Sequence, residues 1–197
     1  GHRPALAVTL PDRKQGRGRK VSPSPVAIAA EELGIEVFKC GDVNLPEARE
    51  RILAAGGEWA SICAFGQLIK EPLLTDLPML NVHPSLLPRW RGAAPIERSI
   101  MAGDEQTGVC VMRLVAGLDS GPVALREATP IEPGEDFGSL SERLARIGGD
   151  LLVKALDGTA DGSIEWTEQV DSEATYAEKI DADDRQPAPA QGPGLRA

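Results

Sequence analysis

The chain has 197 residues, 42% of them hydrophobic, which suits one α/β domain with a buried core. No apolar run approaches the roughly 18 residues of a membrane span, so an integral membrane protein is excluded. The net charge of −9 would argue against a nucleic-acid partner if it were spread evenly. However, residues 1–131 carry 15 basic and 15 acidic side chains, whereas residues 132–197 carry 6 and 15. The start of the chain is locally basic, and only local charge bears on partners.

The first part of the chain alternates strand and helix patterns. Strands are expected at residues 5–10, 35–38, 59–65 and 79–83, and helices at residues 25–33, 46–55 and 70–77. Ser24 is placed to cap the first of these helices, and Pro25 suits its first turn. The stretch 11–20 is too charged and too glycine-broken for a core element and is expected to be a loop. Strands separated by helices predict a parallel sheet with crossover helices.

The pattern changes after residue 106. Two strand-like runs, 107–115 and 122–131, flank a short link with two glycines and an acid, which predicts a hairpin-like, antiparallel connection. Leucines and isoleucine at helical spacing predict a helix over residues 138–156. Beyond residue 181 the composition turns rich in Pro, Ala, Gly and Gln, which cannot pack a core.

The densest polar constellation lies at residues 81–95. Asn81 and His83 alternate along a predicted strand, so they share one face at its carboxyl end, where sites lie in parallel sheets. An amide donor beside a titratable imidazole suits a tetrahedral oxyanion, although both residues could simply finish a strand. Asp119, set among glycines, could supply a carboxylate for proton transfer or could only satisfy turn amides.

Other chemistry has less support in the sequence. Cys40, Cys63 and Cys110 are widely spaced and odd in number, so neither a disulfide framework nor a zinc site is indicated, and no metal is expected. A reducing, cytoplasmic setting fits these free thiols. The segment 16–18 (Gly-Arg-Gly) lacks the third glycine of a dinucleotide loop, and its basic flanks suit external phosphates, with a solvated turn as the alternative.

The motif at residues 81–96, Asn-Val-His-Pro-Ser-Leu-Leu-Pro-Arg-Trp-Arg-Gly-Ala-Ala-Pro-Ile, resembles the signature of the methionyl-tRNA formyltransferases. Segments 10–26, 103–121 and 175–180 agree with that family in the same order, so the resemblance covers about residues 1–181. The Asn/His/Asp set is common to folate-dependent formyltransferases. The Arg-Trp-Arg-Gly-Ala-Ala-Pro-Ile stretch and the basic Gly-Arg-Gly loop narrow the resemblance to the tRNA enzymes.

The resemblance implies a fold, which is a Rossmann-like, open, mostly parallel sheet flanked by helices. It implies that the formyl group of 10-formyltetrahydrofolate passes to the α-amine of methionyl initiator tRNA for translation initiation. Asn81 and protonated His83 would hold the oxyanion, and Asp119 would orient or charge His83 and assist proton removal. The implied folate contacts are Ser85, Leu86, Leu87 and Pro88, and the implied tRNA contacts are Arg13, Lys14, Arg17, Arg19, Lys20, Arg89 and Arg91.

The resemblance also implies a domain organisation. Residues 1–160 correspond to the catalytic domain, residues 161–181 to a connector, and residues 182–197 are expected to be a disordered low-complexity tail. The family has a first strand, a glycine-rich turn and a helix that would precede Gly1, and a small β-barrel domain after the connector. We therefore expect a chain that lacks both the first strand–turn–helix unit and the barrel domain. We also expect a monomer.

Two other hypotheses about function stay open. One is the same chemistry on a small amine, such as an amino sugar or glycinamide ribonucleotide, and the other is a non-catalytic folate- or RNA-binding fragment.

Overall fold

A computed structural model describes residues 1–15 and 20–184, so most of the tail expected at residues 182–197 lies outside the described residues. The strands are β1 (Ala7–Thr9), β2 (Arg13–Gln15), β3 (Lys20–Ser22), β4 (Val37–Lys39), β5 (Ala60–Cys63), β6 (Met79–His83), β7 (Arg91–Gly92), β8 (Gln106–Arg113), β9 (Val123–Pro130) and β10 (Tyr176–Ala177). The helices are α1 (Pro25–Glu32), α2 (Pro46–Leu53), α3 (Leu73–Asp76), α4 (Pro95–Met101) and α5 (Phe137–Asp161), with a 3-10 turn at Asp171–Glu173. No described helix is long and apolar enough to cross a bilayer.

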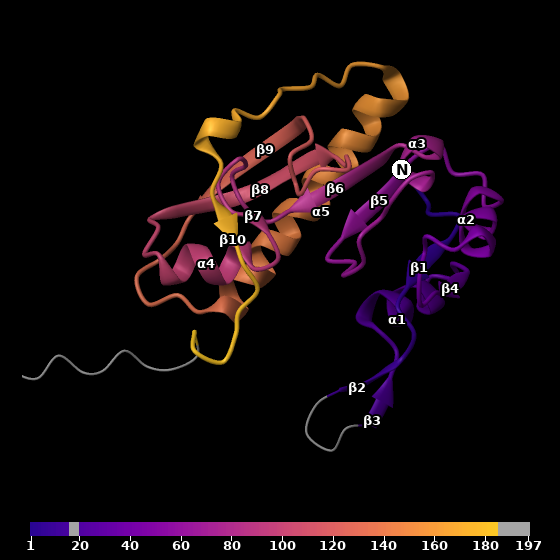
Figure 1. Cartoon of the computed structure of the whole chain (residues 1–197), viewed down its shortest axis with the longest axis horizontal. Helices are drawn as coiled ribbons and strands as arrows, with labels where there is room; N and C mark the ends of the chain where they lie inside the picture. Colours follow the sequence, from indigo (N-terminus) through magenta and orange to yellow (C-terminus); the bar gives the residue numbers. More distant parts are fainter. Residues whose placement is uncertain (16–19, 185–197) are drawn as a thin grey trace, which may run out of the picture.

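The architecture is α/β, as the sequence predicts, with its strands divided among several sheets (Figure 1). The largest sheet has the order β5-β6-β8-β9, in which β5 and β6 are parallel and β8 is antiparallel to both neighbours. The predicted antiparallel connection between residues 107 and 131 is therefore confirmed. A second parallel pair, β1 and β4, lies with α1 and α2 in another part of the fold.

The main core forms where α5 packs on the large sheet. Leu140, Leu144 and Leu151 of the helix meet Leu80 of β6 and Val109 of β8, all of them buried. Asp136 caps the start of the helix by accepting a hydrogen bond from the Ser139 amide at 2.8 Å. The helix runs to Asp161, five residues beyond its predicted end. It ends there because Gly162 adopts the left-handed conformation that terminates many helices.

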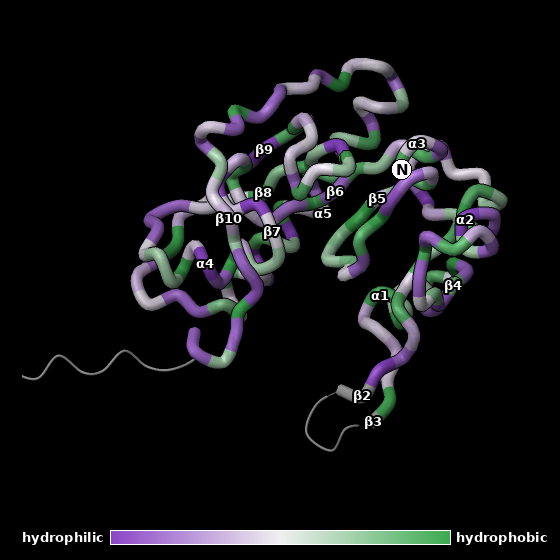
Figure 2. Tube along the Cα trace, in the orientation of Figure 1, coloured by the Kyte–Doolittle hydropathy of each residue, from purple (hydrophilic) through white to green (hydrophobic). Residues whose placement is uncertain are grey.

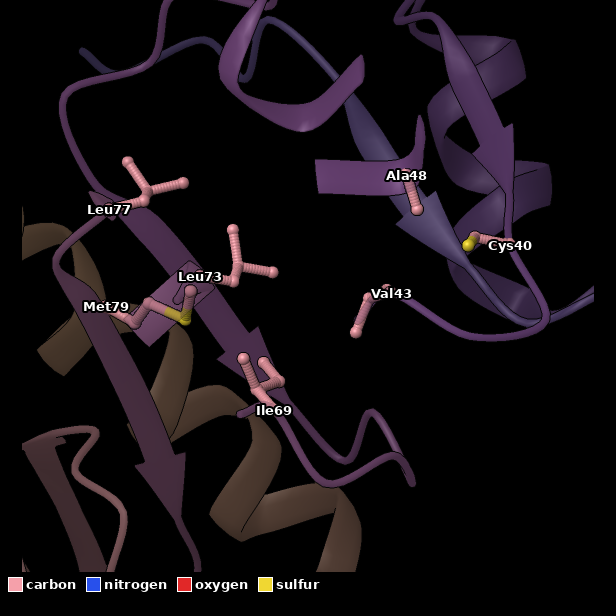
Figure 3. Packing of buried hydrophobic residues seen from close by; sticks show 7 residues of the cluster. All are labelled: Cys40, Val43, Ala48, Ile69, Leu73, Leu77 and Met79. Carbon is pink, nitrogen blue, oxygen red and sulfur yellow. The ribbon is translucent and has the colours of Figure 1, made fainter. Parts of the chain in front are cut away.

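A second cluster joins the β1–β4 pair to the large sheet. Cys40 and Val43 follow β4 and Ala48 lies in α2. They face Ile69, Leu73 and Leu77 from the segment between β5 and β6, and Met79 at the start of β6 (Figure 3). In the described residues β5 pairs with β6 alone and β1 with β4 alone. Nevertheless β5 is drawn almost entirely in hydrophobic colours (Figure 2). Ala60 and Ile62 of β5 pack against this cluster, whereas Ser61 and Cys63 are exposed, so side-chain contacts on one face of β5 connect the two sheets without a backbone ladder between them.

Two elements differ from the sequence prediction. The stretch expected as a loop at residues 11–20 contains β2 and the first residue of β3. These strands pair antiparallel, with Arg13 opposite Ser22, and the hairpin projects away from the body (Figure 1). A charged ribbon that leaves the body shows no alternation of apolar residues, so periodicity did not reveal it. Helix α4 was also not predicted, because seven residues opening with proline give little periodic pattern.

Adjacent glycines in α5 give a test of its packing. A Cβ at Gly148 would lie 2.8 Å from Cγ1 of Val82, whereas one at Gly149 would meet nothing within 4 Å. We expect Gly149→Ala to raise the free energy of unfolding by about 0.5–1 kcal/mol through helix propensity. Gly148→Ala should lower it by about 1–3 kcal/mol because α5 must move off β6. Denaturant titration of both variants checks this, and equal effects would show that Gly148 does not set the helix–sheet distance.

Candidate active site

Strand β6 delivers the first two candidate residues to one place. Asn81 and His83 are buried, with 8% and 4% of their surface exposed, and both point to the same face of the strand because they are two residues apart. β6 is held between β5 and β8, with His83 opposite Cys110. Both side chains are therefore fixed by an internal strand rather than by a surface loop.

The two ring nitrogens of His83 have different neighbours. Its Nε2 lies 2.8 Å from the carbonyl oxygen of Trp90. A carbonyl only accepts hydrogen bonds, so Nε2 carries a hydrogen in either charge state of the ring. Its Nδ1 faces Oδ2 of Asp119 at 3.7 Å. Nδ1 is thus the ring nitrogen that faces the carboxylate.

Asp119 reaches this site from the link between β8 and β9. Its Oδ2 accepts a hydrogen bond from the Gly92 amide at 2.9 Å, and its Oδ1 accepts one from Nδ2 of Asn81 at 3.4 Å. The alternative interpretation of the sequence was that Asp119 bonds to the amides of its own turn. Its carboxylate bonds instead to Gly92 and Asn81, which lie elsewhere in the chain. The structure brings Asn81, His83 and Asp119 together, although Asp119 is 36 residues from His83 in the chain.

The segment expected to contact folate turns half of its side chains inward. Ser85 and Leu87 are fully buried, and the Ser85 hydroxyl donates to the carbonyl of Arg89 at 2.6 Å. Leu86 and Pro88 are only half-buried. The residues of this segment that could touch a ligand with their side chains are therefore Leu86 and Pro88, while Ser85 and Leu87 hold the segment in shape.

Arg89 and Trp90 form a cluster with Asp104. The Arg89 Nε and the Trp90 indole nitrogen donate to the same Asp104 oxygen at 2.9 and 2.8 Å, and the guanidinium lies 4.5 Å from the indole centroid. The hydrogen bond from Arg89 holds the pKa of the Asp104 carboxyl below its usual value, and the indole adds to this effect. The cluster orients Trp90, whose carbonyl holds His83. Trp90 is thus a structural part of the site.

The structure separates the two arginines of the motif. The Arg89 side chain is 46% exposed, so it can face a partner. The Arg91 side chain is only 4% exposed, and its guanidinium donates to Gln169 at 2.9 Å and to Asp171 at 2.8 Å. The expectation that Arg91 binds tRNA is therefore corrected: a guanidinium enclosed by protein partners has a structural role, and a phosphate does not reach it.

Three of the other expected tRNA contacts lie on the projecting hairpin. Arg13 is exposed in β2, and Lys14 and Lys20 lie in β2 and β3. Arg17 and Arg19 lie outside the described residues. The hairpin is distant from the Asn81–His83–Asp119 constellation in the fold, and its base follows directly from β1 (Figure 1).

A segment after α5 completes the site and was missed as a functional element. The Thr175 hydroxyl accepts a hydrogen bond from the Trp90 amide at 2.9 Å, and β10 pairs with β7. A Cβ on Gly92 would lie 2.8 Å from the carbonyl of Ala177, so only glycine fits there. The resemblance marked residues 175–180 without giving them a role. A cavity of about 320 Å³ beside them is lined by Arg91, Gly92, Ala93, Leu118, Tyr176, Ala177 and Glu178.

Over the parts of the chain that the structure describes, no group of three or more His, Cys, Asp and Glu side chains is arranged to hold a metal ion. The constellation offers instead an amide donor, an imidazole and a carboxylate within reach of one another. Such a set can stabilise an oxyanion and transfer a proton in one place.

Comparison with known proteins gives a consistent family. A family model described as formyl transferase matches residues 2–156. A methionyl-tRNA formyltransferase of Halorhodospira halophila is 48% identical over 187 residues, covering 93% of this chain and 60% of that protein. One of Methylococcus capsulatus is 43% identical and covers 92% and 59%. The chain thus spans about three fifths of the length of these relatives.

The solved structures agree on the fold. Glycinamide ribonucleotide transformylase 1 from Symbiobacterium toebii superposes with a TM-score of 0.70 at 24% identity, covering 82% of this chain and 80% of that one. The corresponding enzyme from Geobacillus kaustophilus has a TM-score of 0.60 at 27% identity, with coverages of 74% and 78%.

The Asp104 cluster predicts a pH-dependent contribution to stability. The carboxyl has a lowered pKa in the folded state, so its contribution is present above its unfolded pKa of about 4 and is lost as the pH falls through the folded value. We expect Asp104→Asn to lower the free energy of unfolding at pH 7 by about 1–3 kcal/mol. The deficit should shrink below about pH 4. Urea titrations of parent and variant between pH 3 and pH 7 measure this, and a constant deficit would contradict it.

Proposed function

The chain belongs to the formyl transferase family, and from that premise we propose that it transfers the formyl group of 10-formyltetrahydrofolate to the α-amino group of methionyl initiator tRNA. The observation that carries the proposal is the approach of the Asp119 carboxylate to Nδ1 of His83, with Asn81 bonded to the same carboxylate. The relatives named above support the tRNA as acceptor. The proposal places the protein in the cytoplasm as a monomer that takes part in translation initiation.

The residues at the site fit the proposed co-substrate. When bound, 10-formyltetrahydrofolate supplies a formyl group on nitrogen, which is an acyl donor. Asn81 carries two amide hydrogens, one directed at Asp119, which leaves the other to donate to the oxygen that becomes negatively charged. Leu86 and Pro88, half-buried in the segment that follows His83, give an apolar surface suited to a flat ring system.

His83 and Asp119 divide the remaining tasks in this proposal. His83, protonated on Nδ1, donates to the same oxyanion, while its Nε2 stays bonded to the Trp90 carbonyl and holds the ring in place. The ionised Asp119 stabilises the imidazolium and accepts the proton that the attacking amine must lose. This proton is passed on to the tetrahydrofolate nitrogen, so that the C–N bond to the acceptor amine replaces the C–N bond to the donor and tetrahydrofolate leaves as a neutral amine. The burial of His83 strengthens these interactions, because little water competes for them.

The charge of the hairpin supports a tRNA acceptor over a small amine. Residues 10–22 carry five basic side chains against Asp12 alone. A basic ribbon that projects from the body suits a phosphate backbone and has no use in holding an amino sugar or glycinamide ribonucleotide. Those small amines, and a fragment that binds without turnover, are the alternatives that the experiments below distinguish.

Replacing the proposed catalytic residues tests the chemistry. His83→Ala and Asp119→Ala should each lower kcat/KM for formyl transfer to methionyl-tRNA by about 10²–10⁴, because each removes a positioned proton-transfer group. Asn81→Ala should cost about 10²–10³ through loss of an oxyanion donor. The control is His2→Ala, since His2 is the other histidine and pairs with Asp157 on the surface. Variants of His83 and Asp119 as active as the parent would show that the site is elsewhere.

Neutralising the hairpin tests the acceptor. Exchanging Arg13, Lys14, Arg17, Arg19 and Lys20 for Gln should raise KM for methionyl-tRNA and leave KM for the folate unchanged. The slope of log Kd against log salt should fall by roughly 0.7–0.9 for each phosphate that is no longer neutralised. Arg146→Gln is the control, because Arg146 is an exposed arginine on α5 paired with Glu142. Unchanged tRNA kinetics, or turnover of glycinamide ribonucleotide that ignores the hairpin, would favour a small-amine enzyme.

A further inference from the structure

The loop that carries Asp119 adopts an unusual backbone conformation. Asp119 has φ of +43°, in the left-handed region that a residue with a side chain rarely occupies. A Cβ on Gly121, two residues later, would lie 1.9 Å from the carbonyl of Arg113, so the loop also passes very close to the end of β8. A conformation of this kind persists only where surrounding contacts determine it. The placement of the Asp119 carboxylate therefore depends on what holds this loop.

Gln169 bonds the loop on both sides of its turn. Its Nε2 donates to the carbonyl of Asp119 at 2.8 Å and to the carbonyl of Gly121 at 2.7 Å. One amide nitrogen has two hydrogens, so both are satisfied by these two main-chain oxygens. The bonds run across 50 and 48 residues of chain, which makes them tertiary contacts rather than part of the turn itself.

The orientation of the Gln169 amide is set by Arg91. Oε1 of Gln169 accepts a hydrogen bond from Nε of Arg91 at 2.9 Å. Arginine only donates, so the amide oxygen must face Arg91 and the amide nitrogen must face the loop. Because the Arg91 side chain is 4% exposed and also bonded to Asp171, the amide rests on a fixed group.

The main chain brings Gln169 to this position. Thr167, two residues earlier, exchanges hydrogen bonds of 2.9 and 2.8 Å with Val123, the first residue of β9. This bridge lies immediately after the Asp119 loop, so the segment that follows α5 runs beside the loop in a defined register. Gln169 is half-buried there.

We propose that Gln169 is a positioning residue, which holds the Asp119 loop so that the carboxylate faces His83 and accepts from the Gly92 amide. Its part in catalysis rests on the proposed formyl transfer, whereas its hold on the loop does not. The amide acts through the two carbonyls that flank the turn, and Arg91 prevents it from rotating. In this proposal the buried Arg91 acts on the site by fixing the orientation of the Gln169 amide.

Gln169→Glu tests the proposal with little change in size. The variant keeps an oxygen for Arg91 and replaces the doubly donating nitrogen with an oxygen that faces two carbonyls. Gln106→Glu is the matched control, because Gln106 is exposed at the start of β8 and undergoes the same change in charge. Asp119→Ala serves as the reference for complete loss of the carboxylate.

Hydrogen exchange of the Gly92 amide reports the position of the carboxylate without any substrate. In the full chain, Gln169→Glu and Asp119→Ala should each speed this exchange by about tenfold or more, and Gln106→Glu should leave it unchanged. An unchanged Gly92 exchange rate in Gln169→Glu would overturn the proposal. This measurement stands even if the parent chain transfers no formyl group, a result that would reject the proposed function alone.

Kinetics then distinguish positioning from general support of the fold. In the parent background, Gln169→Glu should lower kcat on the order of 100-fold with KM values unchanged, as misplacement of a reacting group by about 1 Å does. In the Asp119→Ala background it should change kcat less than twofold, because there is no carboxylate left to position. Equal losses in both backgrounds, or a loss that follows the melting temperature, would mean that Gln169 only supports the fold.

Discussion

The contact between the Asp119 carboxylate and the His83 ring, 3.7 Å from Oδ2 to Nδ1, requires several distant segments of the chain to meet. A carboxylate and an imidazole that are both largely buried lose hydration, and this costs free energy unless other groups bond to them. The Gly92 amide and Asn81 supply these bonds to the carboxylate, and the Trp90 carbonyl supplies one to the ring. The segments around residues 81, 90 and 119 must therefore meet, and two of them do so with left-handed residues, Trp90 and Asp119.

The segment that follows α5 allows those conformations to persist. Thr175 bonds to the Trp90 amide, β10 pairs with β7, and the Gln169 amide bonds to the loop of Asp119. The backbone N–H and C=O groups of an extended segment are available to bond to neighbouring segments. Those of a helix interior are already bonded to each other. The expectation that residues 161–181 act as a connector toward another domain leaves out this contribution. These residues form one wall of the site.

Acidic and basic side chains are concentrated in different parts of the fold. The acidic surplus arises after residue 131, and several of its carboxylates meet arginines within the fold, as Asp171 does with Arg91 and Glu135 with Arg143. Arg13, Lys14 and Lys20 lie instead on a hairpin that leaves the body. In the proposed function, attraction of tRNA would depend on this hairpin more than on the net charge, since screening limits each charge to about 8–10 Å.

The sequence by itself determined the α/β class, the antiparallel pair β8–β9, the alternation that sets Asn81 beside His83, and the family resemblance that joined Asp119 to them. These follow from local periodicity and from contiguous motifs, which are properties of neighbouring residues. Only the tertiary structure decided that Arg91 is buried, that Ser85 and Leu87 turn inward, and that Gln169 meets the Asp119 loop. Hydrogen bonds across 48–50 residues leave no periodic trace, because they depend on where separate elements pack and not on the spacing within any one of them.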